Sequence, residues 1–276
     1  MAATGATQAE LILRQQVRAQ RSFNTQVVIW WVVVLGVLIA LFSGISLQLG
    51  PLNLQTMQLD GDFISRAAPL ISEGAILTLT ISAASIVIAS VLALLTALAR
   101  LSHIAPLYAI ASFYVSLIRG TPLLLQIIFL FLGLPRMGIV LSGPLAGIVA
   151  LSLNYGAYMS ETFRAGIQSV GKGQREAALA LGMTNGQMMR RIVLPQALRL
   201  VIPPIGNDFI AMLKDSSLVS ITGFAHELMW LAQNLGRREF RSLEALLVVA
   251  LWYWGMTIIF TWLQGRLEKR LARGDR

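Results

Sequence analysis

Long apolar segments separated by short polar stretches dominate the pattern of this chain. A transmembrane helix needs about 20 predominantly apolar residues. The segments that meet this length are 27–47, 74–99, 104–134, 138–160, 192–213 and 245–265. The third is interrupted by Arg119-Gly120-Thr121-Pro122, and the fifth holds Pro203-Pro204 and Asp208, where we expect a break in the helix. The pattern predicts an all-α integral membrane protein with six transmembrane helices.

Composition supports a membrane protein. The chain is 56% hydrophobic and 13% charged, whereas soluble domains carry about 25% charged residues. The absence of cysteine excludes disulfides and thiolate metal sites. The net charge of +9 is better explained by cytoplasmic loops and contacts with anionic lipid than by nucleic acid. The first apolar segment begins only at Val27 and no cleavage pattern follows it, so it predicts a retained span and not a signal peptide.

The distribution of Lys and Arg predicts the orientation. With the N-terminus inside, the inside segments hold 14 basic residues and the outside segments hold 5. This bias predicts that both termini and the 161–191 loop are cytoplasmic. It also makes residues 50–72 an external loop. The basic cluster at 237–241 is the evidence against this orientation.

The 161–191 loop carries its own structural signals. Residues 174–181 are good helix formers, and Gly182 can end that helix in a left-handed conformation. Thr184-x-x-Gln187 predicts a capping box that opens a second short helix. Such a unit can insert into a groove of a partner, although an ordinary amphipathic connector is the alternative.

The spacing in this loop is specific. Glu176-Ala177-Ala178, three residues, Gly182, nine residues and then Ile192-Val193-Leu194-Pro195 resembles in full the EAA loop of permease subunits in bacterial ABC importers. Further stretches resemble the polar amino acid permeases that import histidine, glutamine, glutamate and arginine. These are Arg119-Gly120-Thr121-Pro122 with Gln126, Ser152-Leu153-Asn154-Tyr155-Gly156-Ala157-Tyr158, and Leu213-Lys214-Asp215-x-Ser217-Leu218. The resemblance covers roughly residues 70–270.

The resemblance implies an architecture and a set of partners. Residues 71–270 would form a five-helix importer transmembrane domain with a cytoplasmic coupling helix. Residues 1–70 would add a cytoplasmic tail, an extra transmembrane helix and an external loop. The expected function is that of a non-enzymatic permease subunit in a bacterial cytoplasmic (inner) membrane. Its expected partners are two ABC ATPase subunits, a second permease subunit, and an external binding protein that delivers the amino acid.

The chain contains no Gly-x4-Gly-Lys-Ser/Thr phosphate loop, so ATP and Mg²⁺ are expected on the partner subunits and no cofactor on this one. The coupling residues that the resemblance implies are Glu176, Ala177, Ala178, Gly182, Arg190 and Arg191.

Ionisable side chains in and directly after the fifth apolar segment suggest the substrate site. Asp208 and Asp215 are seven residues apart and share a helix face, with Lys214 near it. The carboxylates could bind an ammonium group and Lys214 an α-carboxylate. The alternative is that Lys214 and Asp215 pair locally at the interface while Asp208 caps a broken backbone. Arg119 and Asn154 are further candidates, although Arg119 could instead hold the helix break, and Asn154 and Glu161 could bind across helices.

Two carboxylates on one face favour a cationic amino acid, with glutamine or glutamate as the alternative substrate. A standalone channel or secondary transporter would leave the EAA loop without a purpose. An intramembrane serine protease would need a histidine within the bilayer, but His103 is predicted at the edge of a span and His226 in a loop.

Overall fold

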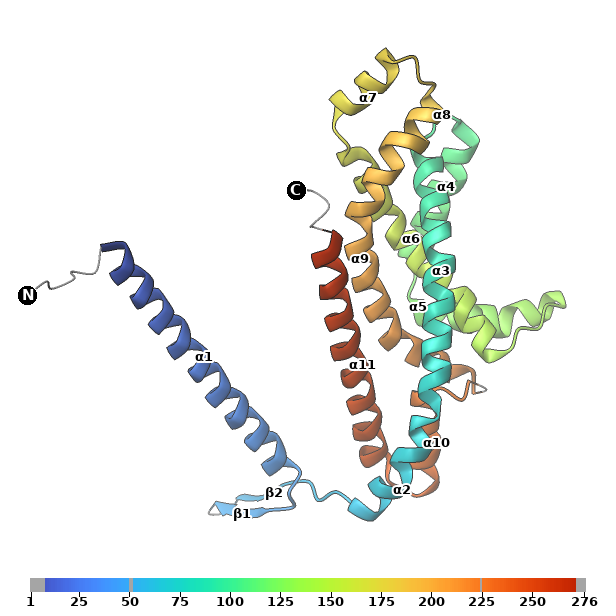
Figure 1. The fold of residues 1–276 in the computed structure, drawn as a ribbon. Helices are drawn as coiled ribbons and strands as arrows, with labels where there is room; N and C mark the ends of the chain where they lie inside the picture. Colours follow the sequence, from blue (N-terminus) through green and yellow to red (C-terminus); the bar gives the residue numbers. More distant parts are fainter. Residues whose placement is uncertain (1–7, 50–51, 224, 272–276) are drawn as a thin grey trace, which may run out of the picture. The chain divides into compact units, whose positions relative to one another are not determined.

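The structure is a computed structural model that describes the backbone of residues 8–49, 52–223 and 225–271 (Figure 1). The chain divides into two compact units, Met1–Gly61 and Asp62–Arg276. Each unit is described by itself below.

The first unit consists of one long helix and a β-hairpin. Helix α1 spans Gln8–Leu41, and from Val28 to Ile39 its large apolar side chains are exposed. The hairpin pairs β1 (Ser46–Leu49) antiparallel with β2 (Leu52–Gln55). The predicted span at 27–47 therefore ends earlier, at Leu41. The exposed apolar surface of α1 fits a lipid environment, because lipid does not drive apolar side chains into a protein core.

The second unit is a helical bundle, in which α3, α6, α9 and α11 run along the long axis (Figure 1). Its α-helices are α2 (Gly61–Ser72), α3 (Gly74–Leu101), α4 (Ala105–Arg119), α5 (Leu123–Ile128), α6 (Gly143–Ser169), α7 (Lys172–Ala180), α8 (Asn185–Met188), α9 (Leu194–Asp215), α10 (Leu228–Arg238) and α11 (Ser242–Leu271). Two π-helical turns, η1 (Phe129–Gly133) and η3 (Met189–Val193), and two 3₁₀ segments, η2 (Leu134–Met137) and η4 (Ser216–Thr222), connect them. Helix α7 lies at one end of the bundle, and α2 and α10 lie at the other.

Small side chains allow α3 and α6 to pack closely at the centre of the bundle. Ala89, Ala93 and Ala97 of α3 are fully buried. A Cβ atom at Gly156 of α6 would lie 2.9 Å from the Tyr114 hydroxyl oxygen and 3.1 Å from Leu92 Cβ. Glycine is therefore needed at this crossing, as is common where membrane helices approach one another.

Helix α2 corrects one expectation. Residues 50–72 were predicted to be an external loop, yet this region contains β2 and the amphipathic α2. Phe63, Ala67 and Ile71 are buried on one face of α2 and pack in a cluster with residues of α10 and α11. The exposed Asp62 lies in the first turn of this helix, away from the buried face.

Three helices are long and apolar enough to cross a membrane by themselves, within the described residues: Gln16–Leu41, Gly61–Leu101 and Ser242–Arg270. A fourth candidate is the pair Ala105–Arg119 and Leu123–Met137, which is bent by 107°. Helices α6 and α9 carry polar side chains and prolines that lower their apolar content. The all-α membrane fold is confirmed, and the count of six spans stays a prediction.

The bent pair replaces the single interrupted span that was predicted from 104 to 134. Pro122 disfavours a helical conformation at the residue before it, and Pro122 itself is extended with φ −64° and ψ 139°. Helix α4 therefore ends at Arg119, and α5 begins only at Leu123. The chain turns a sharp corner here and does not continue in one direction.

The predicted break at Pro203-Pro204 is wrong, because α9 is helical without interruption from Leu194 to Asp215. The two prolines lack backbone donors, yet the helix continues through them, and a side chain of α11 binds nearby. The Gln264 amide of α11 donates to the Pro203 carbonyl oxygen at 3.2 Å and to Asn207 Oδ1 at 3.0 Å.

Candidate functional site

The 172–191 loop forms the predicted helix, glycine and helix. Gly182 has φ +78°, and the N–H groups of Gly182 and Met183 donate to the carbonyl oxygens of Leu179 and Ala178 at 2.9 and 3.1 Å. These are the two hydrogen bonds of a Schellman motif, which ends a helix with a left-handed residue. The predicted capping box is also confirmed, since the Gln187 N–H donates to Thr184 Oγ1 at 3.3 Å and the Thr184 N–H donates to Gln187 Oε1 at 3.0 Å.

The six candidate coupling residues divide between two faces of this loop. Ala178 is only 3% exposed and packs in a cluster with Ile167, Met188, Val193 and Ala197. The other five are exposed, namely Glu176, Ala177, Gly182, Arg190 and Arg191. Ala178 therefore attaches the loop to its own bundle, whereas the remaining residues are available to a partner.

Arg175 is a connection that sequence reasoning missed. Its guanidinium donates from Nε to the Val170 carbonyl oxygen at 3.4 Å and from Nη2 to the Ile167 carbonyl oxygen. Both acceptors lie at the C-terminal end of α6, where carbonyl groups lack helical partners and carry partial negative charge. One charged side chain of α7 thus binds α7 to the end of α6.

The loop continues into α9 without a gap. Helix α8 passes into η3, where the Leu194 N–H donates to the carbonyl oxygen of Met189, and α9 begins at Leu194. Pro195 lies in the first turn of α9, where a missing N–H costs little. The second half of the loop and α9 are therefore one continuous helical element.

Helix α9 presents two carboxylates toward α6. Tyr155 of α6, only 8% exposed, donates from its hydroxyl to Asp215 Oδ2 at 2.8 Å. Asp208, two turns earlier on the same face, is half-buried and makes no hydrogen bond or ion pair within the described residues. A backbone-capping role for Asp208 is thus not observed. Lys214 is exposed and forms no ion pair with Asp215 in this part of the chain.

Asn154 binds across helices. Its amide donates to Gln126 Oε1 at 3.1 Å. The Gln126 amide in turn donates to the Ile118 and Thr121 carbonyl oxygens at 2.8 and 3.1 Å and to Thr121 Oγ1 at 2.9 Å. Gln126 therefore satisfies the backbone that the 107° corner leaves open, and Asn154 attaches this corner to α6.

Arg119 lies in a cluster around Glu161. Arg100 of α3 and Arg164 of α6 form close ion pairs with this carboxylate, the latter at 2.8 Å, and Arg119 of α4 approaches it at 3.6 Å. The Arg119 guanidinium carbon is also 5.1 Å from the centroid of the Tyr158 ring, within the range of a cation–π contact. Glu161 thus joins three helices near the end of the bundle that carries the 172–191 loop.

Glu227 is a second residue that sequence reasoning missed. It is fully buried and accepts hydrogen bonds from the N–H groups of Met229 and Trp230 at 2.8 and 2.6 Å and from the Tyr253 hydroxyl at 3.0 Å. Burial raises the pKa of the Glu227 carboxyl to about 7, although these three donors favour its ionised form. Glu227 caps α10 and joins it to α11, and a lone acidic residue before a helix was the available sequence signal.

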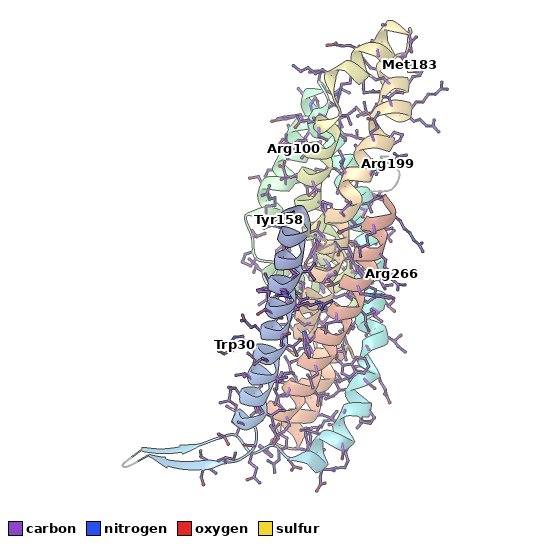
Figure 2. All side chains as sticks on the ribbon, turned by 60° about the vertical axis from the view of Figure 1, so that its left-hand side comes forward. Trp30, Arg100, Tyr158, Met183, Arg199 and Arg266 are labelled. Atoms are coloured by element: carbon purple, nitrogen blue, oxygen red, sulfur yellow. The ribbon has the colours of Figure 1, made fainter. Side chains whose placement is uncertain are left out.

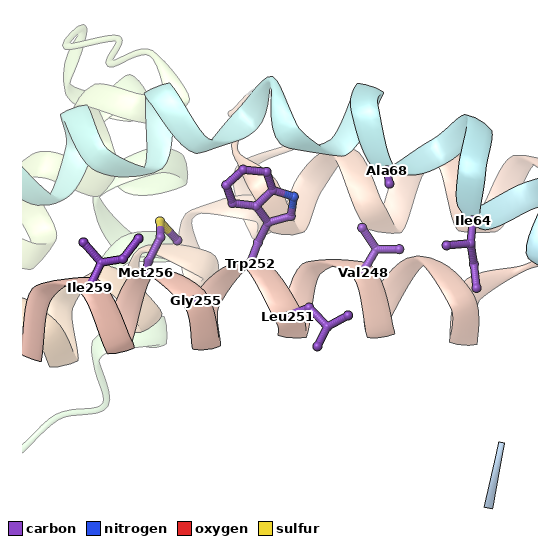
Figure 3. A pocket seen from close by; sticks show the side chains of 8 residues that line it. All are labelled: Ile64, Ala68, Val248, Leu251, Trp252, Gly255, Met256 and Ile259. Atoms are coloured by element: carbon purple, nitrogen blue, oxygen red, sulfur yellow. The ribbon is translucent and has the colours of Figure 1, made fainter. Parts of the chain in front are cut away.

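Two openings in the second unit are apolar. One of about 350 Å³ lies between α2 and α11 and is lined by residues such as Ile64, Ala68, Trp252 and Ile259 (Figure 3). Another of about 390 Å³ lies beside the corner between α4 and α5, lined mainly by Leu117, Leu125 and Phe129. Neither resembles a site for a polar amino acid, which would need several convergent polar groups. Within the described residues, no group of three or more His, Asp or Glu side chains could hold a metal ion.

The sequence of this chain is similar to one family of transport proteins and to several named permeases. Residues 85–273 match the family model described as binding-protein-dependent transport system inner membrane component. The arginine transport system permease protein ArtQ of Bacillus subtilis (strain 168) is 38% identical over 220 residues, which cover 79% of this chain and all of ArtQ. The L-cystine transport system permease protein TcyB of the same strain is 41% identical over 206 residues, 74% of this chain and 88% of TcyB. The glutamine transport system permease protein GlnP of Escherichia coli K12 is 36% identical over 217 residues, 78% of this chain and 99% of GlnP.

Solved structures of ABC transporters share the fold of this chain. A crystal structure of an amino acid ABC transporter with histidines superposes with a TM-score of 0.72 at 38% identity, covering 78% of this chain and all of that chain. An inward-facing MetNI methionine ABC transporter shares the fold, with a TM-score of 0.60 at 19% identity, covering 73% of this chain and 96% of that chain. The chain therefore belongs to the family of binding-protein-dependent transport system inner membrane components and is a membrane permease subunit of the amino-acid ABC transporter type.

Proposed function

We propose that this subunit moves a polar, cationic amino acid into the cell by alternating access, with ATP hydrolysed by partner subunits. A second permease subunit completes the pathway, and the pair couples to two ATPase subunits, one of which docks on the exposed residues of the 172–191 loop. An external binding protein delivers the substrate. ATP and Mg²⁺ bind on the ATPases. The observation that carries the proposal is the continuous path from this loop to the carboxylates of α9.

Coupling follows two routes through the chain. The first runs through α8 and η3 into α9, and the second runs from Arg175 into the end of α6. Because Tyr155 of α6 binds Asp215 of α9, the two routes meet at the carboxylates. Movement of a docked ATPase would then alter the space between α6 and α9.

Asp208 and Asp215 form the centre of the proposed substrate site, with Lys214 and Asn154 at its edges. The Asp208 carboxylate is half-buried and has no partner within the described residues, so it is available to an ammonium or guanidinium group. One relative is named an arginine permease, which agrees with a cationic substrate, whereas others are named for glutamine and cystine. Arg119 belongs to the Glu161 cluster and is not part of this proposed substrate site.

The proposed location is the bacterial cytoplasmic membrane, with residues 1–70 as an addition to the importer domain 71–270 and both termini inside. The chain has no natural cysteine, so single cysteines introduced at Thr4 and Arg273 can test the orientation. Both should resist an impermeant thiol reagent in intact cells, and labelling at position 4 would remove the first span or invert the proposed topology.

The substrate site is tested by Asp208→Asn, with Asp62→Asn as the matched control, because Asp62 is an exposed carboxylate in the first turn of α2. A charge-assisted hydrogen bond contributes about 1.5–3 kcal/mol, and 1.4 kcal/mol is about tenfold in affinity. We expect uptake of arginine or histidine to fall at least tenfold in the Asp208 variant, with normal expression and normal co-purification of the ATPase.

Uptake of labelled arginine, histidine, glutamine and glutamate is measured side by side. Unchanged arginine and histidine uptake would refute both the site and the cationic preference. Higher glutamate uptake by the variant would favour the anionic alternative.

A further inference from the structure

The cluster around Glu161 carries more positive than negative charge. Three guanidinium groups, from Arg100, Arg119 and Arg164, surround one carboxylate. Glu161 is the single carboxylate that the described part of the chain brings within ion-pair distance of them. The cluster therefore has two positive charges in excess, on side chains that are 19%, 43% and 35% exposed. Such an excess next to a membrane attracts an anion.

Arg119 is the member of the cluster with free donors. It lies 3.6 Å from Glu161, too far for a hydrogen bond, and within the described residues its guanidinium donates no hydrogen bond at all. The guanidinium carbon lies 5.1 Å from the centroid of the exposed Tyr158 ring, and this contact restricts its movement. A planar guanidinium held in this way suits a phosphate group, which accepts two parallel hydrogen bonds.

An apolar groove begins directly beside Arg119. Leu117 and Ile118, which precede Arg119 in α4, line the opening of about 390 Å³ together with Leu125 and Phe129 across the corner. Leu117, Leu125 and Phe129 are each more than half exposed. A free phosphate or nucleotide would leave this surface uncovered, whereas an acyl chain would cover it.

The position of the cluster along the bundle also suits contact with lipid headgroups. In Figure 2, Tyr158 lies along the bundle between Arg100, in the last turn of α3, and Arg266, near the end of α11. Basic residues at the ends of membrane helices lie at the level of lipid headgroups.

We propose that Arg119 binds the phosphate of an anionic phospholipid, with Arg100 and Arg164 strengthening the attraction and an acyl chain lying in the groove between α4 and α5. This site is separate from the carboxylates of α9. It would attach the corner at residues 120–122 to the surrounding bilayer and make anionic lipid a structural component of the subunit.

The test measures binding of phosphatidylglycerol by the full chain, purified with its co-purifying subunits and stripped of endogenous lipid. Labelled phosphatidylglycerol is titrated in mixed micelles, with phosphatidylcholine as the neutral comparison. One basic group near a membrane surface changes anionic-lipid affinity about fivefold, so Arg119→Gln should weaken the saturable binding by about that factor. Leu125→Asn, which keeps every charge, should also weaken it.

Arg266→Gln is the matched control, since Arg266 also stacks on an aromatic ring, 3.7 Å from the centroid of Trp262. This variant should bind like the parent. Arg119→Lys keeps the charge without the planar edge and should give intermediate affinity, which keeps the test decisive if the glutamine variant fails to fold. Equal losses in the Arg119 and Arg266 variants would show diffuse attraction only and overturn the site. Full competition by inorganic phosphate, or an unaffected Leu125 variant, would overturn the lipid as its ligand.

Discussion

Replacement of Arg175 by glutamine tests whether the coupling loop acts on the bundle through the end of α6. The half-buried guanidinium donates to the carbonyl oxygens of Ile167 and Val170. A hydrogen bond from a charged group contributes about 1.5–3 kcal/mol, and partial exposure favours the low end of this range. A loss of about 1.5 kcal/mol reduces the ratio of attached to detached α7 about tenfold.

The assay is ATP hydrolysis by the reconstituted complex, with and without substrate-loaded binding protein. We expect Arg175→Gln to lower the stimulated rate at least threefold while the unstimulated rate, which belongs to the ATPase, is kept. Arg175→Lys should recover part of the stimulation, because an ammonium group can still donate to one carbonyl. Lys172→Gln is the matched control, since Lys172 is an exposed cation of the same helix that makes no hydrogen bond or ion pair within the described residues. Parental stimulation in Arg175→Gln, with the ATPase co-purifying normally, would refute the second coupling route.

Two further variants test the loop and the opposite end of the bundle. Gly182→Asp should insert normally but abolish uptake, because a side chain is disfavoured at φ +78° and would disturb the turn. The matched control is Gly171→Asp, at an N-cap position that favours aspartate, and it should transport like the parent. The second test concerns Glu227, whose pKa is about 7 in the folded state against an ordinary 4.5. Because the folded state holds this proton more tightly than the unfolded state, the free energy of unfolding should fall as pH rises from 4.5 to 7. The slope is at most about 1.4 kcal/mol per pH unit; thermal midpoints in micelles should show this decline in the parent and not in Glu227→Gln, and identical profiles would contradict the assignment.

Short-range signals in the sequence predicted local structure well. Gly182 and the Thr184-x-x-Gln187 pair act within one or two helical turns, and their hydrogen bonds form as expected. The break predicted at Pro203-Pro204 does not occur, and Gln264, 61 residues away, donates to the Pro203 carbonyl oxygen in this region. No local pattern could reveal this contact.

In the candidate site, too, local spacing predicted some features, whereas contacts between helices could not be predicted. Helical spacing correctly placed Asp208 and Asp215 on one face, since a seven-residue interval is close to two turns. It could not show that Tyr155 binds Asp215, or that Arg119 faces Glu161 and not α9, because these contacts depend on how separate helices pack. Arg175 was visible only as one of several basic residues in a loop, and its acceptors are backbone atoms that no residue type reveals.

The π-helical turn at Met189–Val193 determines the direction in which each later side chain of α9 points around the helix axis. A π turn holds one more residue than an α turn, and one residue corresponds to about 100° of rotation about the helix axis. With Met188 buried against the end of α6, this extra residue decides which way the later side chains point. Without it, Asp208 and Asp215 would be rotated by about a quarter of a turn away from Tyr155. A single residue in this turn therefore orients carboxylates several turns further along α9.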